Sequence, residues 1–372
     1  MSEPGTNGRA RGPIFIVGPM GSGTTLMRLV LDSHEHIGIP PETGFMRGYG
    51  ALRFTPFKHS GRDWTARLGW TEPEFDALAR EFYDRIFMRY AEQHGKRRWG
   101  EKTPLHTWHI DDMARLFPDA QFVGVIRHPF GTIASNMTRF KSRLARATWQ
   151  WAQPVREIVS QAARRPDRFV IVRYEDLVRR PEPVLRELLE WLGEPWSPSV
   201  LEHHAVQSER GGKRQVEGSS RVDDPIDETR VAKWTTRMLA EHRQWLEQRV
   251  GPLAEFFGYA LDDREALAPV TADGGALLRG AELDARIERY PALELRKGGD
   301  GGPYDEPYDP RNLMVLRRGE YAQITRPRGL RRIGIAVVRV LPFARARRAA
   351  IKAVRSARGA LGMTRRYRAY RR

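Results

Sequence analysis

Short, largely apolar runs alternate with longer amphipathic stretches along the first two thirds of the chain. The runs Pro13–Val17, Gln121–Ile126 and Arg168–Val172 have the continuous apolar character of strands that are buried on both faces of a parallel sheet. The intervening and following segments show helical periodicity, which predicts helices over Thr24–Ser33, Glu72–Gln93, His106–Phe117, Phe130–Phe140, Thr148–Arg164, Pro183–Leu192 and Glu228–Val250. This alternation predicts an α/β fold with three layers, in which helices flank a central parallel sheet.

The regular alternation fades after Tyr259, and Lys297–Pro310 is rich in Gly, Pro and Asp, as a linker or an exposed loop would be. The pattern therefore predicts four segments. These are a disordered N-terminus over 1–12, the α/β domain over 13–261, a loop-rich linker or extension over 262–325, and a basic helical C-terminal segment over 326–372.

Most of the net charge of +17 comes from the last segment of the chain. Arg326–Arg372 contains 16 Lys and Arg residues and no acidic residue, so the rest of the chain is close to neutral. Apolar positions such as Phe343, Val354 and Leu361 fall on one side of a helix, and cations fall opposite. Two interpretations stay open: this helix packs on the body of the protein, or it binds an anionic membrane surface. Nucleic acid is the disfavoured partner.

Composition excludes several kinds of chemistry. The chain has no cysteine, so disulfides, thiolate metal sites and a cysteine nucleophile are ruled out. Met1–Gly12 lacks the apolar core of a secretory signal, and Ile333–Phe343 is too short to span a bilayer. We therefore expect a cytoplasmic protein, with membrane association through the C-terminal segment as an open alternative.

A glycine-rich loop connects the first predicted strand to the first predicted helix. Gly18–Thr25 (GPMGSGTT) fits the pattern G-x-x-x-x-G followed by two hydroxyl residues. Glycines allow close backbone approach, and the free amides at a helix start attract an anion, so this loop predicts a phosphate site. Nucleotide triphosphatases have a lysine where this chain has Thr24. A phosphotransferase that uses a nucleoside triphosphate, or a purely structural turn, stays open as an alternative.

Together with VIRHP, VRYEDL, GEKTP and VAKW further along, this loop resembles the sulfotransferase family that uses 3′-phosphoadenosine 5′-phosphosulfate (PAPS). The resemblance covers Ile14 to about Tyr259 and is greatest to the carbohydrate and protein-tyrosine branches. It implies transfer of a sulfuryl group from PAPS, without a metal, to a hydroxyl or amine of an unidentified carbohydrate, lipid-linked or small-molecule acceptor. Members usually have Arg or Lys directly before Ser-Gly-Thr, where this chain has Gly21, so catalysis needs another cation.

The resemblance also implies residues that bind PAPS. The loop residues Gly21, Ser22, Gly23, Thr24 and Thr25 would hold the 5′ end, and Arg127 with Ser135 would hold the 3′ phosphate. Tyr174 would lie near the nucleotide, and Lys233 belongs to a region that would close over it. Without the resemblance, each of these residues has a structural alternative. Arg127 could form a surface ion pair, Tyr174 could lie at the edge of the core, and Lys233 could lie in a solvated loop.

Sulfuryl transfer needs a base and a cation near the acceptor. Glu42 resembles the family's glutamate base, although a capping charge at a helix start is the alternative. Lys102 is the candidate for the missing cation, and Arg28 and Arg47 are the next candidates. The alternative for Lys102 is a purely structural ion pair with Glu101. His106 and His109 have no third ligand at metal spacing, so no metal site is expected. A non-catalytic nucleotide-binding or membrane-anchoring member of the fold is a further alternative.

Overall fold

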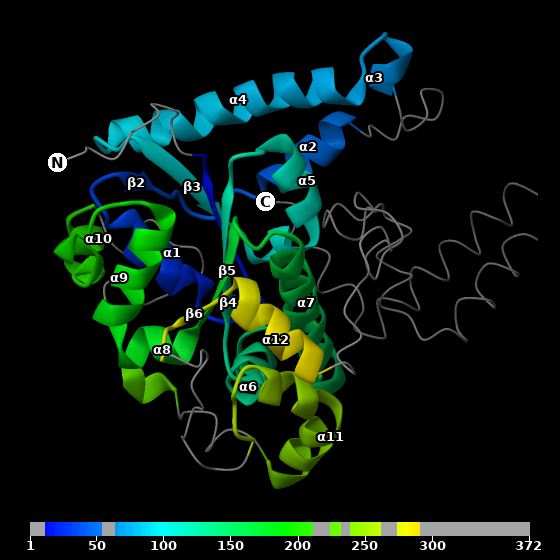
Figure 1. Ribbon diagram of the computed structural model, residues 1–372, viewed down its shortest axis with the longest axis vertical. Helices are drawn as coiled ribbons and strands as arrows, with labels where there is room; N and C mark the ends of the chain where they lie inside the picture. The colour runs from blue at the N-terminus through cyan, green and yellow to red at the C-terminus, as the bar shows by residue number, and fades with distance from the viewer. Residues whose placement is uncertain (1–11, 54–63, 211–223, 232–238, 262–273, 291–372) are drawn as a thin grey trace, which may run out of the picture. The chain divides into compact units, whose positions relative to one another are not determined.

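The structure is a computed structural model that describes residues 12–53, 64–210, 224–231, 239–261 and 274–290 (Figure 1). The chain divides into two compact units, Met1–Tyr308 and Asp309–Arg372, and all of the described residues belong to the first. The basic segment 326–372 lies outside the described residues, so its helix and its membrane affinity stay predictions.

A mixed sheet forms the centre of the described unit, with the strand order β2-β3-β1-β4-β5-β6 (Figure 1). The strands are β1 Ile14–Val17, β2 Ile37–Gly38, β3 Arg98–Lys102, β4 Gln121–Ile126, β5 Phe169–Arg173 and β6 Leu277–Leu278. All neighbouring pairs are parallel except β5 and β6, which are antiparallel. The α/β fold is therefore confirmed, and the antiparallel edge strand is an addition that the sequence pattern did not predict.

Each face of the sheet carries its own apolar core, because successive strand residues point to opposite sides. Phe15 and Val17 of β1 contribute to one core, and Ile14 and Ile16 contribute to the other. The first core is completed by α2 Phe45–Arg53, α4 Glu72–Gln93, α5 Ile110–Leu116, α6 Pro129–Arg139, α7 Leu144–Arg164, α11 Ala240–Phe256 and α12 Gly280–Arg289. The second is completed by α1 Thr24–Asp32, α8 Tyr174–Arg179 and α9 Pro181–Leu192. This confirms the three-layer arrangement.

The remaining helical elements are short. They are α3 Trp64–Arg67, α10 His203–Glu209 beside α1, and the 3₁₀ turns η1 Pro104–His109, η2 Pro198–Val200 and η4 Glu228–Arg230. None of the helices that the structure describes is both long and apolar enough to cross a bilayer.

The predicted helices agree with the structure most closely where the chain has clear start signals. The predicted and observed bounds of α4 coincide, and a capping box between Thr71 and Glu74 fixes its first turn. Helix α6 begins at Pro129, and the side chain of His128 accepts a hydrogen bond from the amide of Phe130. A proline at the first helical position has no amide that needs a partner, so it favours this boundary.

Three predicted elements differ from the structure. The segment expected as one helix over His106–Phe117 is η1 followed by α5, because Pro104 starts a tight turn that ends at His109. The segment expected as one helix over Glu228–Val250 contains the short turn η4 and the helix α11, which continues to Phe256. Residues 232–238, between the two, lie outside the described residues. The stretch expected to be loop-like after Asp262 contains β6 and α12, whose side chains Leu278 and Leu283 are buried in the first core.

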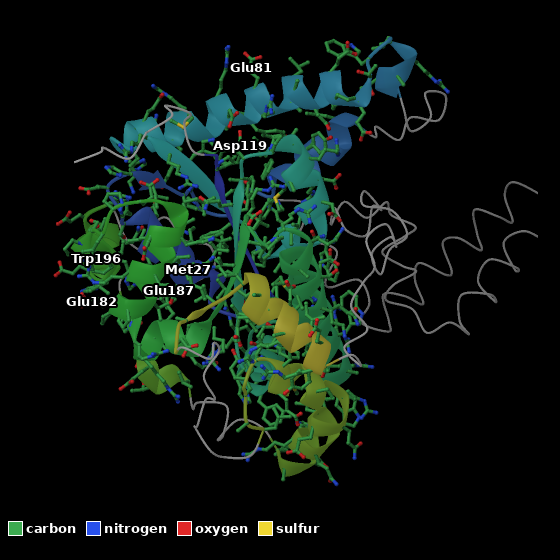
Figure 2. The ribbon with its side chains drawn as sticks, in the orientation of Figure 1. Met27, Glu81, Asp119, Glu182, Glu187 and Trp196 are labelled. Carbon is green, nitrogen blue, oxygen red and sulfur yellow. The ribbon has the colours of Figure 1, made fainter. Side chains whose placement is uncertain are left out.

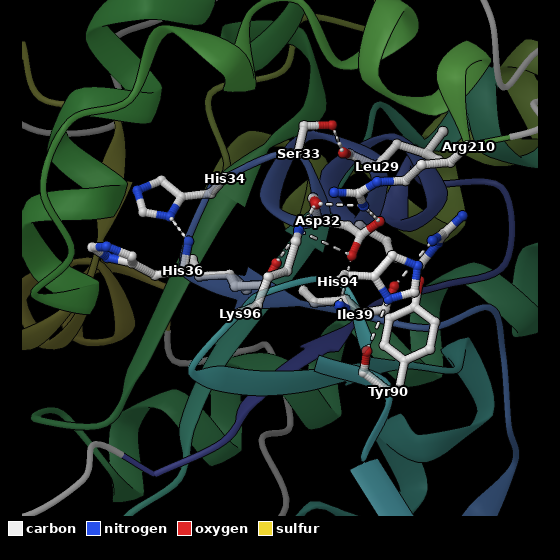
Figure 3. Close-up of polar contacts among 12 residues, drawn as sticks. Leu29, Asp32, Ser33, His34, His36, Ile39, Tyr90, His94, Lys96 and Arg210 are labelled. Atoms are coloured by element: carbon white, nitrogen blue, oxygen red, sulfur yellow. Dashed lines mark hydrogen bonds and ion pairs between the residues drawn. The ribbon is translucent and has the colours of Figure 1, made fainter. Parts of the chain in front are cut away.

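A buried ion network around Asp32 holds the C-terminal end of α1 in place (Figure 3). Oδ1 of Asp32 accepts a hydrogen bond from the amide of Ile39 at 2.8 Å, and Oδ2 accepts from Gln207 at 3.0 Å and from Arg210 at 3.1 Å. Nζ of Lys96 donates to the carbonyl of Asp32 and lies 3.6 Å from its carboxylate. Burial lowers the pKa of Lys96 to about 8. The network joins α1 to α10 and to the approach to β3.

We predict that Asp32→Asn lowers the free energy of unfolding by ~3–5 kcal/mol, because it leaves Lys96 and Arg210 facing no counter-charge in a buried position. The measurement is urea unfolding at neutral pH. Glu182→Gln is the control, since Glu182 belongs to an exposed pair with Arg186 and should change stability by less than ~0.5 kcal/mol. Equal unfolding midpoints for Asp32→Asn and Glu182→Gln would show that the network does not stabilise the fold.

Candidate functional site

The glycine loop Gly18–Thr25 lies at the carboxyl edge of the sheet, between β1 and α1, as the sequence predicts. Gly21 and Gly23 have backbone φ values of +85° and +102°, which residues other than glycine rarely adopt. Gly23 also lies against the ring of Tyr174, where a Cβ atom would overlap the ring. The amide of Gly18 donates to Oγ1 of Thr107 at 3.1 Å, which ties the loop to η1. The loop therefore needs glycine for its conformation and its contacts.

Arg127 and helix α6 lie directly against this loop. Nη1 of Arg127 lies 3.5 Å from the carbonyl oxygen of Gly21, and its Cζ lies 4.5 Å from the centre of the Tyr174 ring. A Cβ atom at Gly21 would come within 3.4 Å of Oγ of Ser135 and 3.1 Å of Oδ1 of Asn136. The structure thus brings together the loop, Arg127, Ser135 and Tyr174, which the sequence placed far apart in the chain.

Buried polar side chains lie in the same loop and on α6 next to it. Ser22, Thr132 and Asn136 are fully buried, and within the part of the chain that the structure describes their polar side-chain atoms have no hydrogen-bond partner. Leaving a buried polar group without a partner costs ~1–3 kcal/mol, so such groups normally meet a partner from outside the fold. Their position beside Gly21 and Arg127 fits a polar, anionic ligand.

Sequence analysis missed Thr132 and Asn136. They are four residues apart on α6, so they share one helical face. A signal existed, because Thr132, Ser135 and Asn136 are polar residues in an otherwise apolar stretch that starts at Phe130. A single polar residue in a helix does not predict a binding site, and only the fold shows that this face of α6 meets the glycine loop.

A buried network behind Arg127 holds the end of β4 in place. The carboxylate of Glu175 accepts hydrogen bonds from the amide of His128 at 3.0 Å and from the hydroxyl of Tyr259 at 2.9 Å. Burial raises the pKa of Glu175, against the opposing charge of Arg127. The indole of Trp151 donates to the carbonyl of Arg127 at 2.9 Å. The backbone of Arg127 is therefore fixed from two sides.

Glu42 and Lys102 form an ion pair beside the loop. Nζ of Lys102 donates to Oε1 of Glu42 at 2.5 Å and to Oγ1 of Thr25 at 3.2 Å. The side chain of Lys102 is fully buried, whereas that of Glu42 is 39% exposed. A cation thus reaches the loop from β3, and a carboxylate next to it faces solvent, where an acceptor molecule could approach.

The alternatives for this pair do not match the structure. Glu101 does not pair with Lys102, because neighbouring residues of a strand point to opposite faces. Its carboxylate instead accepts from the Thr43 hydroxyl at 2.9 Å, the Thr103 hydroxyl at 2.6 Å and the ring of His106 at 2.8 Å. Although burial opposes the effect, His106 and these donors lower the pKa of Glu101. Glu42 does not cap a helix either, since α2 begins only at Phe45.

The structure places the next candidate cations, Arg28 and Arg47, on α1 and α2, and it does not describe Lys233. Nη1 of the buried Arg28 donates to the carbonyl of Ile39 at 3.1 Å, and Arg47 is an exposed residue of α2. Lys233 lies outside the described residues, so its role over the nucleotide stays a prediction.

One cluster has the residue types of a metal site, but it lies far from the glycine loop along the strands. His34, His36 and Glu194 place one ligand atom each within 4.8 Å of one another, at the start of β2. Both ring nitrogens of His34 are already bonded, to the amide of His36 and to the carbonyl of Pro195. Arg98 also binds Glu194, at 3.2 Å. These contacts fit a structural ion network rather than a metal centre.

Comparison with known proteins gives a consistent result. A sequence model of the sulfotransferase family matches residues 13–198. The chain is 28% identical to protein-tyrosine sulfotransferase 1 of Danio rerio over 238 residues, which cover 60% of the chain and 66% of that protein. It is 25% identical to nodulation protein NoeE of Sinorhizobium fredii over 322 residues, 78% of the chain and 75% of that protein. The sulfotransferase domain of the Synechococcus PCC 7002 olefin synthase is 24% identical, with a TM-score of 0.46, over 67% of the chain and 98% of that domain.

We predict that the buried His128 makes the stability of the fold sensitive to acid. Burial lowers its pKa to about 4, well below the ordinary 6.5. Between these values the unfolded chain binds a proton that the folded chain does not, so the free energy of unfolding should rise as pH increases from 4 to 6.5. In His128→Asn, which keeps a capping acceptor, this rise should be smaller. Urea unfolding at several pH values measures it, and identical slopes for the two proteins would contradict the assignment.

Proposed function

Because the chain belongs to the sulfotransferase family, we propose that it takes a sulfuryl group from PAPS and transfers it to a hydroxyl group of an acceptor. The observation that carries this proposal is the placement of two anion-binding features side by side. The glycine loop meets a guanidinium at the end of a strand. Within the described residues, the buried hydroxyl of Ser22 in the loop and the buried amide of Asn136 beside it have no hydrogen-bond partner.

The residues present fit a doubly phosphorylated adenosine. The backbone of Gly21–Thr25 and the hydroxyl of Ser22 would hold the 5′ phosphosulfate end, where the helix dipole favours negative charge. Arg127 and Ser135 would hold the 3′ phosphate, since a guanidinium can donate two parallel hydrogen bonds to phosphate oxygens. Tyr174 would support both features, because its ring contacts Gly23 and lies under Arg127. No metal ligand is needed in this arrangement.

Bound PAPS supplies a sulfuryl group on a phosphate leaving group. Glu42 would accept the proton of the acceptor hydroxyl as the new oxygen–sulfur bond forms and the bond to the phosphate oxygen breaks. Lys102 would provide the positive charge that the loop lacks at Gly21, since its ammonium already reaches Thr25. The same ammonium holds the Glu42 carboxylate in place through their ion pair.

A second candidate function is favoured by Gly21 itself. A family member without the usual basic loop residue could bind the nucleotide without transferring sulfate. This non-catalytic candidate and the proposed enzyme share the binding site and differ only in turnover. Sulfate transfer from labelled PAPS to a panel of phenols, tyrosine peptides and oligosaccharides separates them.

We predict that Arg127→Ala weakens binding of adenosine 3′,5′-bisphosphate by ~10- to 100-fold, the effect of losing a charged hydrogen-bond donor. Isothermal titration calorimetry measures the affinity, and Arg186→Ala on the exposed face of α9 is the control. Wild-type binding should be independent of magnesium and stronger than binding of ATP. Tighter, magnesium-dependent binding of ATP would instead favour a triphosphate-dependent phosphotransferase.

We predict that Glu42→Gln lowers the turnover number by ~10²–10⁴-fold and leaves the affinity for adenosine 3′,5′-bisphosphate unchanged, because the side chain acts on the acceptor proton rather than on the nucleotide. The readout is initial-rate sulfate transfer to the best acceptor of the panel, with calorimetry beside it. Glu35→Gln, an exposed carboxylate near the opposite end of α1, serves as the control. Full activity of Glu42→Gln would remove it as the base.

A further inference from the structure

The connection between α6 and α7 has a strongly basic surface. Between Asp119 and Glu157 the sequence contains six Lys and Arg residues and no acidic residue. Four of these cations are exposed, and we call them the α6–α7 patch: Arg139, Lys141, Arg143 and Arg146. Residues 1–325 are close to neutral overall, so the patch is a local concentration of positive charge.

Local structure does not explain these cations. Among the residues that the structure describes, Lys141, Arg143 and Arg146 have no carboxylate partner. Arg143 and Arg146 lie at the start of α7, where the helix dipole favours acidic residues, and the first turn contains none. Lys141 has a φ of +53°, a conformation that glycine adopts at a lower cost. The charges are therefore held against the local preference of the backbone, which indicates a role in binding.

The α6 end of the patch adjoins the candidate nucleotide site. The side chain of Asn136 lies beside the glycine loop, close to Gly21. Its carbonyl accepts hydrogen bonds from the amides of Phe140 at 3.1 Å and Ser142 at 3.4 Å. The connection between the two helices is therefore folded back onto a residue that contacts the loop.

Helix α7 brings the other end of the patch to the same site. The indole of Trp151 donates to the carbonyl of Arg127, which is the candidate ligand of the 3′ phosphate. Arg146 precedes Trp151 by five residues, which is ~8 Å along the helix. The Debye length is ~30 Å at ~0.01 M salt, so charges of the patch act on an anion near Arg127 without touching it.

Strand order separates the patch from the acceptor side of the site. Helix α6 follows β4, whereas Glu42 and Lys102 lie beyond β1, next to β2 and β3. The patch therefore borders the part of the site that would hold the nucleotide rather than the part that holds the candidate base.

We propose that the α6–α7 patch attracts the anionic nucleotide and accelerates its association with the site. This inference rests on the proposed function, since adenosine 3′,5′-bisphosphate carries a charge of about −3 to −4 at neutral pH. The attraction acts before any contact forms. It therefore raises the association rate constant and leaves the dissociation rate constant almost unchanged.

Stopped-flow mixing of the full chain with adenosine 3′,5′-bisphosphate, followed by tryptophan fluorescence, measures both rate constants. A variant that combines Lys141→Gln, Arg143→Gln and Arg146→Gln should lower the association rate constant ~10-fold at ~0.01 M salt. At ~0.5 M salt the fall should be less than ~2-fold, because salt screens charges that do not touch the ligand. The dissociation rate constant should change by less than ~2-fold at both salt concentrations.

Three exposed arginines of α4 provide a matched control. Combining Arg80→Gln, Arg85→Gln and Arg89→Gln removes the same charge from a helix at the opposite end of the described unit from α6 (Figure 1), and Glu81 marks its outer side (Figure 2). This variant should associate at nearly the wild-type rate. Lys141→Gly removes one charge of the patch and suits the left-handed backbone, so its expected ~2-fold fall cannot come from loss of folding.

The results that overturn the inference are specific. Equal falls for the patch variant and the α4 variant would show that only net charge matters. Faster dissociation with unchanged association would make the patch a direct contact of the bound nucleotide. Normal nucleotide association with a raised KM for an acidic acceptor would assign the patch to the acceptor. A wild-type chain that does not bind adenosine 3′,5′-bisphosphate would instead overturn the proposed function, and this inference with it.

Discussion

Parallel hydrogen bonding between β3, β1, β4 and β5 brings the functional residues together. Strand register aligns Ile16 with Lys102 and Ile126 with Arg173, so the carboxyl ends of these strands meet at one edge of the sheet. The glycine loop, Lys102 and Arg127 each follow or end one of these strands. Residues more than a hundred positions apart in sequence, such as Gly21 and Arg127, thereby reach contact distance.

Much of this arrangement could be predicted from local patterns. The runs around Ile14, Gln121 and Phe169 are apolar enough to identify central strands, and Pro129 and the capping box of α4 mark helix starts. The glycine loop follows from its position between a predicted strand and a predicted helix, whereas the roles of Arg127 and Ser135 come from the family resemblance. In these cases local propensity and the buried position favour the same structure, which is the condition under which pattern analysis succeeds.

Other parts could not be predicted because tertiary contacts override the local pattern. β3 (RWGEK) has three charged residues in five, yet all five are buried, since Arg98, Glu101 and Lys102 each find polar partners from other elements. β6 is too short to show a pattern, and it is held by β5 and by Glu187, which accepts from the amide of Ala276 at 2.8 Å. Thr132 and Asn136 could not be predicted as site residues, because the sequence does not show that α6 faces the glycine loop.

The conformation of Gly21 constrains how this sequence can change. Its left-handed backbone disfavours any side chain, and the space beside it is occupied by Asn136 and Ser135. A single substitution that reintroduces a basic side chain here would therefore meet both backbone strain and a crowded neighbour. A side chain at position 21 therefore has to be matched to the side chains of α6, so the residues at positions 21, 135 and 136 constrain one another although they lie on separate elements.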